Sequence, residues 1–428
     1  MAGATEMMGA TSGTGAAAEK QRAVAERFKA VRRRTLELVK PLTPEDMMVQ
    51  SCAEASPAKW HLAHTAWFFE SFVLREFLEG YKPFHSDFAW LFNSYYVSYA
   101  NFPEKRLRAS FSRPGLEEVQ RYRAHVDAAM ERLLEGEAHP EAVRRTELGA
   151  HHEEQHQELL LTDILHAFYT NPLKPKYAEG GWETGADAAR AMGFVEFAGG
   201  MREAGQGGDG FCYDNERPRH KVWLEPFALA DRQVTNGEYA EFMADGGYAR
   251  AELWLSAGWD AVQREGWRAP LYWTERDGAW RIFTLRGEQA LEAMRAAAVS
   301  QVSYFEADAF ARWAGRRLAT EFEWEVAVEG RAVEGNLLEG GRLLPGAAKA
   351  DGQWFGDCWE WTASAYLGYP GFRPLEGALG EYNGKFMSGQ MVLRGGSCAT
   401  PKAHIRGSYR NFFGPETRWQ FSGIRLAR

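Results

Sequence analysis

The sequence predicts a helical bundle followed by an irregular, turn-rich second domain. Its 428 residues exceed what one hydrophobic core usually organises, which favours two domains of about 200 residues each. Apolar side chains recur at helical spacing as far as Phe168, and this periodicity largely disappears beyond it. The counts of 16 Trp and 44 Gly are high, which is typical of a fold that packs large aromatic side chains between loops. These observations give the two halves of the chain different fold classes.

The charge and hydropathy patterns exclude several classes of partner. A net charge of −8 offers no basic surface for nucleic acid or an anionic membrane, so small-molecule substrates are expected. No run approaches the roughly 18 consecutive apolar residues of a membrane span. Residues 1–19 lack the basic start and apolar core of a secretory signal, and their composition favours a disordered tail. We therefore expect a cytoplasmic protein.

Four helices are predicted in the first domain, which covers residues 20–170. In the first of them, Val24, Phe28 and Val31 form an apolar stripe between basic residues, and Pro41 ends the helix. Four helices with histidines facing inward are typical of a bundle that binds metal in its core. Their predicted ranges are 20–40, 56–80, 116–136 and 148–168.

The fourth predicted helix carries the most informative motif, a pair of histidines four residues apart. On a helix this spacing places His152 and His156 on one face, where the two imidazoles can share a metal ion. Asp163 continues the same stripe and is placed to orient a ligand histidine. Gln155 lies beside the pair, close enough to meet a bound substrate. The pair alone is weak evidence, because helices also carry histidines by chance, so a metal site needs a third ligand.

The second predicted helix offers two candidates for that third ligand, His61 and His64. Either side chain can point inward. The alternative is that both are hydrogen-bonded core residues, which is more common for a lone histidine in an aromatic-rich helix. The residues alone do not choose between them.

The connection over residues 91–115 is too long for a simple turn between bundle helices and is therefore expected to carry function. Tyr95 and Tyr96 are its chemically useful side chains, although adjacent tyrosines also serve to cap a bundle. A linker rich in Pro and Gly is predicted over residues 171–192. In the second domain, 193–428, no period of about 20 to 50 residues repeats, which excludes a solenoid or a propeller.

Short blocks in the second domain carry a family resemblance. Residues 193–428 resemble the formylglycine-generating-enzyme and sulfatase-modifying-factor fold, an irregular, loop-rich, C-type-lectin-like α+β domain. Six blocks occur in the order of that family, at 216–218 (ERP), 234–239 (VTNGEY), 317–325 (RLATEFEWE), 359–362 (WEWT), 394–397 (RGGS) and 423–426 (GIRL).

The first domain resembles the DinB-like four-helix bundle. This resemblance rests on the H-x-x-x-H pair and on short blocks at 56–57 (SP), 60–64 (WHLAH) and 112–114 (SRP). The two resemblances together imply a multidomain α and α+β protein.

Joined in this order, the two halves resemble the sulfoxide synthases of ergothioneine biosynthesis. These are mononuclear non-haem iron enzymes that join a thiol to the imidazole of Nα-trimethylhistidine (hercynine), with O2 as co-substrate. The resemblance implies one Fe(II) ion bound by His64, His152 and His156, and it implies that His61 is not needed for metal binding. Three neutral imidazoles leave coordination positions open for substrates and dioxygen.

The same resemblance implies roles for residues outside the metal site. A tyrosine close to the iron donates a proton in the family, and Tyr95 and Tyr96 match the tyrosine pair of the members that use free cysteine. Gln155 and Asn411 match positions that contact trimethylhistidine. Phe412 matches a position at which the family has an aromatic residue that faces the quaternary ammonium group of the substrate. Phe413 is expected to line the same cavity, which we expect to lie between the domains.

Two features of the sequence concern the identity of the thiol substrate. Two successive phenylalanines, Phe412 and Phe413, stand where a longer thiol would need polar groups, which favours cysteine over γ-glutamylcysteine. Five arginines are candidates for binding the thiol carboxylate, and the sequence does not choose among Arg106, Arg108, Arg113, Arg410 and Arg418. The oligomeric state is likewise left open.

Three other classes of protein share parts of this sequence pattern. A formylglycine-generating enzyme needs a reactive cysteine pair near its C-terminus, where the sequence offers Cys398 without a partner. Ovothiol-pathway synthases usually carry an added methyltransferase domain. The remaining class comprises non-enzymatic binding modules and DinB-like thiol transferases. The cysteines lack C-x-x-C spacing and are interpreted as reduced thiols, at Cys52, Cys212, Cys358 and Cys398.

Overall fold

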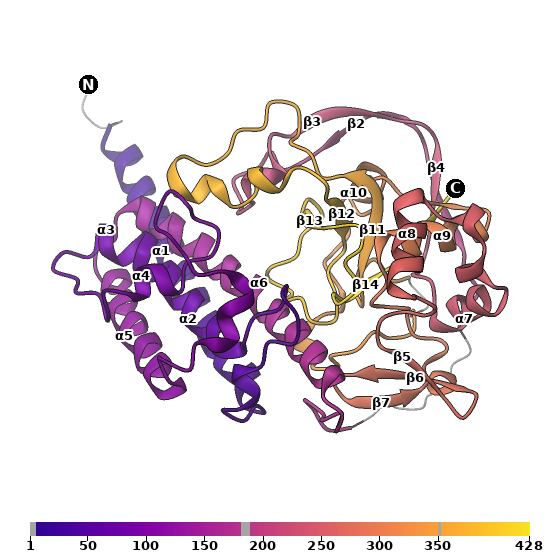
Figure 1. Ribbon diagram of the computed structural model, residues 1–428. Helices are drawn as coiled ribbons and strands as arrows, with labels where there is room; N and C mark the ends of the chain where they lie inside the picture. The colour runs from indigo at the N-terminus through magenta and orange to yellow at the C-terminus, as the bar shows by residue number, and fades with distance from the viewer. Residues whose placement is uncertain (1–5, 181–188, 350–351) are drawn as a thin grey trace. The chain divides into compact units, whose positions relative to one another are not determined.

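The computed structural model describes residues 6–180, 189–349 and 352–428, with side chains from Gly15 onward. The chain divides into two compact units, Met1–Asp163 and Ile164–Arg428 (Figure 1). The border falls inside a helix, so the last turns of that helix belong to the second unit. The domain borders at 170 and 193 stay predictions, and residues 181–188 of the predicted linker lie outside the described residues.

The first unit is helical, and its long helices are the four that the sequence predicts. The second of them continues through one π-helical turn, Glu70–Leu74, into a short α-helix. Among the described residues, no helix is both long and apolar enough to cross a bilayer. The helices are α1 (Glu6–Val39), α2 (Ala58–Phe69), α3 (Arg75–Phe77), α4 (Phe88–Leu91), α5 (Leu116–Glu135) and α6 (Pro140–Thr170), the last of which runs into the second unit.

Two helices begin earlier than predicted. α1 begins at Glu6, inside the segment 1–19 for which a disordered tail was expected. Its residues 16–18 are three alanines, and alanine has the highest intrinsic helix propensity, which an argument from overall composition overlooks. α6 begins at Pro140, because proline lacks only an N–H that the first turn of a helix leaves unused.

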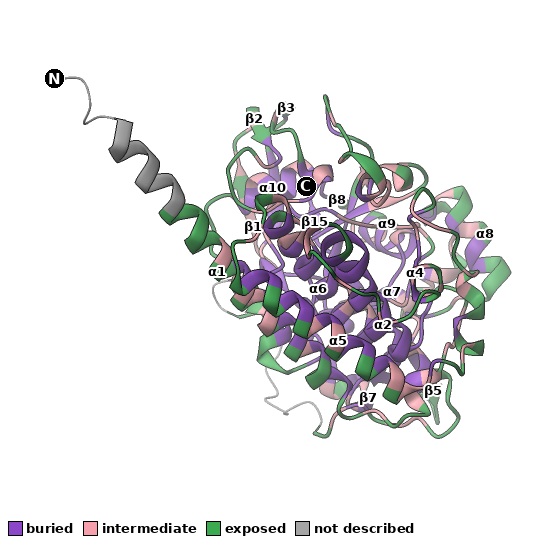
Figure 2. Ribbon diagram, turned by 90° about the vertical axis from the view of Figure 1, so that its left-hand side faces the viewer, coloured by how far each residue is buried: buried purple, intermediate pink, exposed green. Residues whose placement is uncertain are grey.

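α2 lies at the centre of the first unit, because every one of its side chains is buried. α1 and α5, by contrast, alternate between buried and exposed residues (Figure 2). α6 approaches α2 closely at Gly149, where a Cβ atom would lie 2.5 Å from Cε1 of Phe69 and 2.9 Å from Cδ1 of Phe68. Glycine permits this approach, which holds one face of α6 against α2.

A buried carboxylate joins three of these helices. Glu153 on α6 accepts hydrogen bonds from Arg32 of α1 at 2.8 Å and from Arg123 of α5 at 3.0 Å. The hydroxyl of Thr35 donates a third, at 2.6 Å. Burial by itself raises the pKa of Glu153, but the two arginine charges outweigh it and hold the pKa at about 2. The ionised carboxylate therefore fixes the turn of α6 that carries His152.

The second unit is an α+β domain of short elements, as the sequence predicts. Its helices are α7 (Asn236–Ala244), α8 (Ser256–Glu265), α9 (Tyr304–Trp313) and α10 (Glu321–Ala327). Its strands are β1 (Phe194–Phe197), β2 (Gly200–Ala204), β3 (His220–Leu224), β4 (Phe227–Ala230), β5 (Trp273–Arg276), β6 (Ala279–Thr284), β7 (Gly287–Ala290), β8 (Arg317–Leu318), β9 (Gly335–Asn336), β10 (Phe355–Gly356), β11 (Trp359–Ala365), β12 (Met391–Arg394), β13 (Asn411–Phe413), β14 (Ser422–Gly423) and β15 (Leu426–Ala427).

Two four-stranded sheets organise this unit, in the orders β13-β12-β11-β14 and β1-β4-β15-β8. In the first sheet β11 pairs antiparallel with β12 and parallel with β14. Three of the short helices begin with a capping box, in which a Ser or Thr side chain and a Glu three residues later satisfy each other's backbone N–H groups. Such helices rely on caps and packing, which explains why the sequence showed little helical periodicity here.

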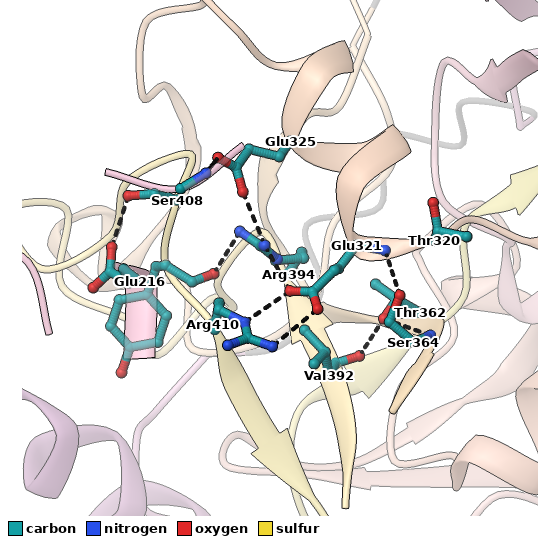
Figure 3. A network of polar contacts seen from close by, with 12 residues as sticks. Glu216, Thr320, Glu321, Glu325, Thr362, Ser364, Val392, Arg394, Ser408 and Arg410 are labelled. Atoms are coloured by element: carbon teal, nitrogen blue, oxygen red, sulfur yellow. Dashed lines mark hydrogen bonds and ion pairs between the residues drawn. The ribbon is translucent and has the colours of Figure 1, made fainter. Parts of the chain in front are cut away.

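The family blocks of the sequence meet in a buried charge network (Figure 3). Glu321 accepts a bidentate pair of hydrogen bonds from Arg410, at 2.8 and 2.9 Å, and one from Arg394 at 2.8 Å. Tyr369 adds a fourth at 3.2 Å, and Glu325 accepts a further bond from Arg394 at 3.0 Å. Burial raises the pKa of Glu321, but the charges of Arg410 and Arg394 outweigh it, and the pKa is lowered.

A second cluster joins three of the blocks. Glu360 on β11 accepts hydrogen bonds from Nε of Arg425 at 2.6 Å and from the indole of Trp324 at 2.7 Å. Blocks 317–325, 359–362 and 423–426 therefore contact one another through one carboxylate. We therefore interpret these blocks as residues that hold the second unit together.

Candidate metal centre

Three histidines converge in the first unit, His64 from α2 and His152 and His156 from α6. One ring nitrogen from each lies within 4.8 Å of the others. His64 and His152 are buried, and His156 is partly exposed. These are the three residues that the resemblance implies as metal ligands, and the fold brings them together from positions about 90 residues apart in the chain.

The spacing of the ring nitrogens suits a shared ligand. Nδ1 of His64 donates to the carbonyl oxygen of Phe92 at 2.6 Å, so its Nε2 carries the lone pair. Nε2 of His152 and Nε2 of His156 lie 3.2 Å apart. Two imidazole nitrogens bound near right angles to one ion, each at roughly 2.1 Å, are about 3 Å apart. The donor set and its spacing therefore fit a metal ion.

Burial keeps these imidazoles neutral. Desolvation lowers the pKa of His64 and of His156 well below the usual value, and the neighbouring His152 lowers both further. Desolvation lowers the pKa of His152 to about 4, although the charge of Glu153 acts in the opposite direction. A neutral imidazole is the form that binds a metal ion, and here it persists at neutral pH without one.

His61 lies beside the three histidines and contacts one of them. Its Nδ1 is 2.8 Å from Nδ1 of His156, and its Nε2 is 3.0 Å from Oδ2 of Asp163. Asp163 also accepts the backbone N–H of Ser56 at 2.8 Å. The sequence predicts that Asp163 orients a ligand histidine, and the structure places His61 between Asp163 and His156.

Aromatic rings enclose the site. Trp60 stacks on His64 at 4.4 Å between ring centroids and 12° between planes, and Trp67 stacks at 5.2 Å and 13°. Phe68 lies 4.8 Å from the ring of His152. Trp60 precedes His64 by four residues, so helical spacing offered a signal for this contact that sequence reasoning missed. The carbonyl of Phe92 gave no signal, because every residue has one.

Arg108 is a buried cation beside this aromatic wall. Its guanidinium carbon lies 3.4 Å from the centroid of Trp60. It donates to the hydroxyls of Ser56 at 2.8 Å and Ser94 at 2.9 Å. Among the described residues, no carboxylate forms an ion pair with it. Burial lowers the pKa of Arg108 to about 10, against the influence of Tyr95 and Asp163.

The two predicted catalytic tyrosines have different surroundings. Tyr96 is buried, with its ring 5.6 Å from that of Trp67 and 5.0 Å from that of Phe72. Tyr95 is half-buried and interacts electrostatically with Arg108. Both lie in the connection that follows α4, as the sequence predicts for residues 91–115.

The remaining predicted site residues lie in two different units. Gln155 is half-buried on α6, in the first unit. Asn411, Phe412 and Phe413 form β13 of the second unit and are also half-buried. The ring of Phe412 stacks on Tyr366 at 4.0 Å and 11°. A cavity that these residues share stays a prediction.

Cys398 is less isolated than its sequence context suggests. Its backbone N–H donates to the carbonyl of Asp357 at 3.0 Å, which brings Cys358 near it. Both thiols are buried. Burial first, and then Cys398, raise the pKa of Cys358 well above the usual value, so this thiol stays protonated and is a poor nucleophile.

Comparisons with known proteins agree with the two domains. A family model described as "Sulfatase-modifying factor enzyme 1-like domain" matches residues 183–354 and 352–428, and one described as "DinB superfamily" matches 27–167. Both resemblances predicted from the sequence are thereby confirmed.

Three curated relatives illustrate the range of similar proteins. Hercynine oxygenase of Mycobacterium tuberculosis is 40% identical over 241 residues, which are 50% of this chain and 55% of that protein. Ergothioneine biosynthesis protein 1 of Schizosaccharomyces pombe is 28% identical over 234 residues, 51% of this chain and 28% of that protein. Formylglycine-generating enzyme of Streptomyces coelicolor is 35% identical over 176 residues, 36% of this chain and 50% of that protein. The chain spans about half the length of the hercynine oxygenases it matches.

Proposed function

The chain belongs to the family of proteins with a sulfatase-modifying factor enzyme 1-like domain, whose model matches more than half of it, and from this premise we propose that it is an iron- and O2-dependent sulfoxide synthase. It joins cysteine to hercynine and gives hercynylcysteine sulfoxide. The S–H bond and one imidazole C–H bond break, and a C–S and an S–O bond form. O2 accepts four electrons, two for each new bond, and its second oxygen atom leaves with the two protons as water.

The three-histidine cluster is the observation that carries this proposal. Its neutral imidazoles bring one ring nitrogen each within 4.8 Å of the others, and nitrogen ligands with open coordination positions suit Fe(II). His64, His152 and His156 would hold the ion. Fe(II) held there would supply O2 reduction and activate the thiol as thiolate. Similarity to hercynine oxygenases supports the same reaction.

Arg108 is our candidate for binding the carboxylate of the thiol substrate. Of the five arginines considered, Arg106 and Arg113 are exposed, whereas Arg410 and Arg418 already pair with Glu321 and Glu306. Arg108 alone among the five combines burial with hydroxyl partners instead of a carboxylate. A buried guanidinium is stabilised by an anionic ligand, and its planar form suits a carboxylate.

The tyrosines supply the proton that oxygen reduction requires. A phenol hydroxyl can hydrogen-bond to a reduced oxygen species and donate a proton in an enclosed site. Tyr95 is coupled to the cation Arg108, and Tyr96 is packed against Trp67, which itself stacks on His64. Either side chain is therefore connected to the metal site through at most two residues.

Four residues are proposed for recognition of hercynine, Gln155, Asn411, Phe412 and Phe413. Gln155 lies one residue before His156 on α6, which suits contact with a substrate bound at the metal. Asn411 supplies an amide, and Phe412 supplies an aromatic face for the trimethylammonium group, an attraction of roughly 0.5 to 2 kcal/mol. Phe413 contributes apolar surface.

The deciding experiment measures iron and coupling together. The purified protein, loaded anaerobically with Fe(II), should bind about one iron per chain and consume O2 when hercynine and cysteine are both added. The product should have the mass of the coupled sulfoxide. Oxygen uptake without the sulfoxide, or conversion of a cysteine-containing peptide to an aldehyde instead, would reject the proposed reaction.

Cysteine is the proposed thiol, and a second measurement tests it. γ-Glutamylcysteine brings an extra carboxylate and amide. Burying these polar groups unpaired beside Phe412 and Phe413 would cost on the order of several kcal/mol. We expect kcat/KM with saturating hercynine to favour cysteine. A preference for γ-glutamylcysteine of about tenfold, roughly 1.4 kcal/mol, would reverse this assignment without affecting the metal site.

A further inference from the structure

We propose that His61 and Asp163 are positioning residues that fix the tautomer of His156, so that His156 presents Nε2 to the metal. The inference rests on the proposed function for the identity of the ion and adds the assignment of two residues that do not touch it. It also revises the expectation that His61 is dispensable.

The hydrogen bonds assign each proton in this relay. An ionised carboxylate only accepts, so Nε2 of His61 donates to Asp163 across the 3.0 Å contact. A neutral His61 then has its lone pair on Nδ1. Nδ1 of His156, at 2.8 Å, must therefore carry the proton and donate it. This leaves the lone pair of His156 on Nε2, the atom that faces Nε2 of His152.

Asp163 is held in place to start the relay. Its Oδ2 accepts the backbone N–H of Ser56 at 2.8 Å as well as the ring of His61. Ser56 comes just before α2 and Asp163 lies on α6, so this carboxylate joins the two segments that carry the metal site. A histidine ligand commonly has its second nitrogen hydrogen-bonded to a carboxylate or carbonyl. His64 has such a partner in the carbonyl of Phe92, and His156 reaches the carboxylate of Asp163 through the ring of His61.

His61 is unsuited to replace His64 as a ligand. Both of its ring nitrogens are engaged, one by His156 and one by Asp163. The nitrogen nearest the site points at Nδ1 of His156, not at the Nε2 atoms that converge.

Two substitutions separate the two ends of the His61 ring. The amide oxygen of His61→Asn can occupy the position of Nδ1 and accept from His156, but this side chain does not reach Asp163. His61→Gln reaches the position of Nε2 and Asp163, but it leaves Nδ1 of His156 without its acceptor. His61→Leu removes both contacts. All three variants differ from the parent at one buried position, so their thermal unfolding serves as a common control for folding.

Metal affinity and spectrum test the relay without reference to turnover. Fe(II) affinity, measured anaerobically against a competing chelator, should fall about 10- to 100-fold in His61→Leu and His61→Gln, the range for loss of a supporting hydrogen bond. His61→Asn should stay close to the parent. Co(II), used as a visible probe, should show a changed absorption spectrum in the Leu and Gln variants and the parental spectrum in the Asn variant.

The outcomes distinguish this inference from the proposed reaction. Equal affinity in the parent and all three variants would overturn the role of His61 and leave the sulfoxide synthase proposal intact. Equal losses in the Asn and Gln variants would show that His61 only fills space, and would overturn it as well. A parent protein that binds Fe(II) but makes no sulfoxide would reject the proposed reaction. In that case, an Fe(II) affinity that is higher in His61→Asn than in His61→Gln and His61→Leu would still support the relay.

Discussion

Two buried polar clusters in this molecule solve opposite problems. In the second unit, Glu321 is surrounded by Arg410, Arg394 and Tyr369, so each buried charge has an opposite charge beside it. In the first unit, the rings of His64 and His152 converge with that of His156, and burial drives the pKa of His64 and of His152 down. A cluster that satisfies itself supports a fold. A cluster whose lone pairs converge is prepared for a ligand.

The largest effect should come from breaking the self-satisfied cluster. Glu321→Gln removes the charge that Arg410 and Arg394 share, which leaves Arg410 without its buried carboxylate and Arg394 with Glu325 alone, and should cost about 3 to 5 kcal/mol of unfolding free energy. Denaturant unfolding measures it. Glu252→Gln, at an exposed carboxylate paired with Arg250, is the matched control and should change nothing measurable. Equal effects in both variants would show that the network carries no stability.

Removing a ligand from the open cluster should act on metal binding and function. His64→Ala should lower coupling activity by more than about 100-fold, because loss of a supporting residue alone costs up to that factor. Iron content and sulfoxide formation measure it. His125→Ala, which changes a histidine bonded to the carbonyl of Lys82, is the control and should keep iron. Retention of both iron and activity in His64→Ala would remove it from the site.

The tyrosine pair should change products more than folding. Tyr95→Phe and Tyr96→Phe each keep the ring but remove the hydroxyl. Loss of a general acid typically lowers the reaction rate about 100-fold or more. We expect at least one single variant to oxidise cysteine to its sulfinic acid instead of coupling it. Chromatography of the products with both substrates present checks this. Normal rate and product ratio in both variants would make the pair structural.

Gly149→Ala should disturb the metal site from outside it. The new Cβ would lie 2.5 Å from the ring of Phe69, and overpacking of a core typically costs about 1 to 3 kcal/mol. Because Phe68 also contacts His152, we expect weaker iron binding together with a lower melting temperature. Gly266→Ala, at an exposed left-handed position with open space around it, should lower stability without changing iron affinity.

The smallest expected effect is on how the unfolding free energy depends on pH in acid. The folded-state pKa of Glu321 is lowered, so below the ordinary value of about 4.3 the unfolded chain binds the proton more readily. The stability that Glu321 contributes is therefore present above that pH and is lost as pH falls through the folded-state pKa. Unfolding free energies measured from pH 5 downward should fall less steeply in Glu321→Gln than in the parent. Identical slopes would contradict the assignment.

The sequence by itself determined what helical spacing and family blocks can determine. A separation of four residues places His152 and His156 on one face of α6, because the period of an α-helix is local. The family blocks fixed the α+β class of the second unit, and the long connection pointed to Tyr95 and Tyr96. Composition misled at the start of α1, because helix propensity acts over a few residues whereas the composition was averaged over the segment 1–19.

Only the tertiary structure decided which side chains meet across the chain. His61 and His64 stand three residues apart on the same helix, yet packing gives them different partners, His156 and Asp163 for His61 and the carbonyl of Phe92 for His64. Arg108 was one of five equivalent arginines until its burial and its bonds to Ser56 and Ser94 set it apart. Hydrogen bonds and desolvation depend on neighbours that are distant in sequence. No local pattern encodes them, and they appear once α2, α6 and their connections have packed.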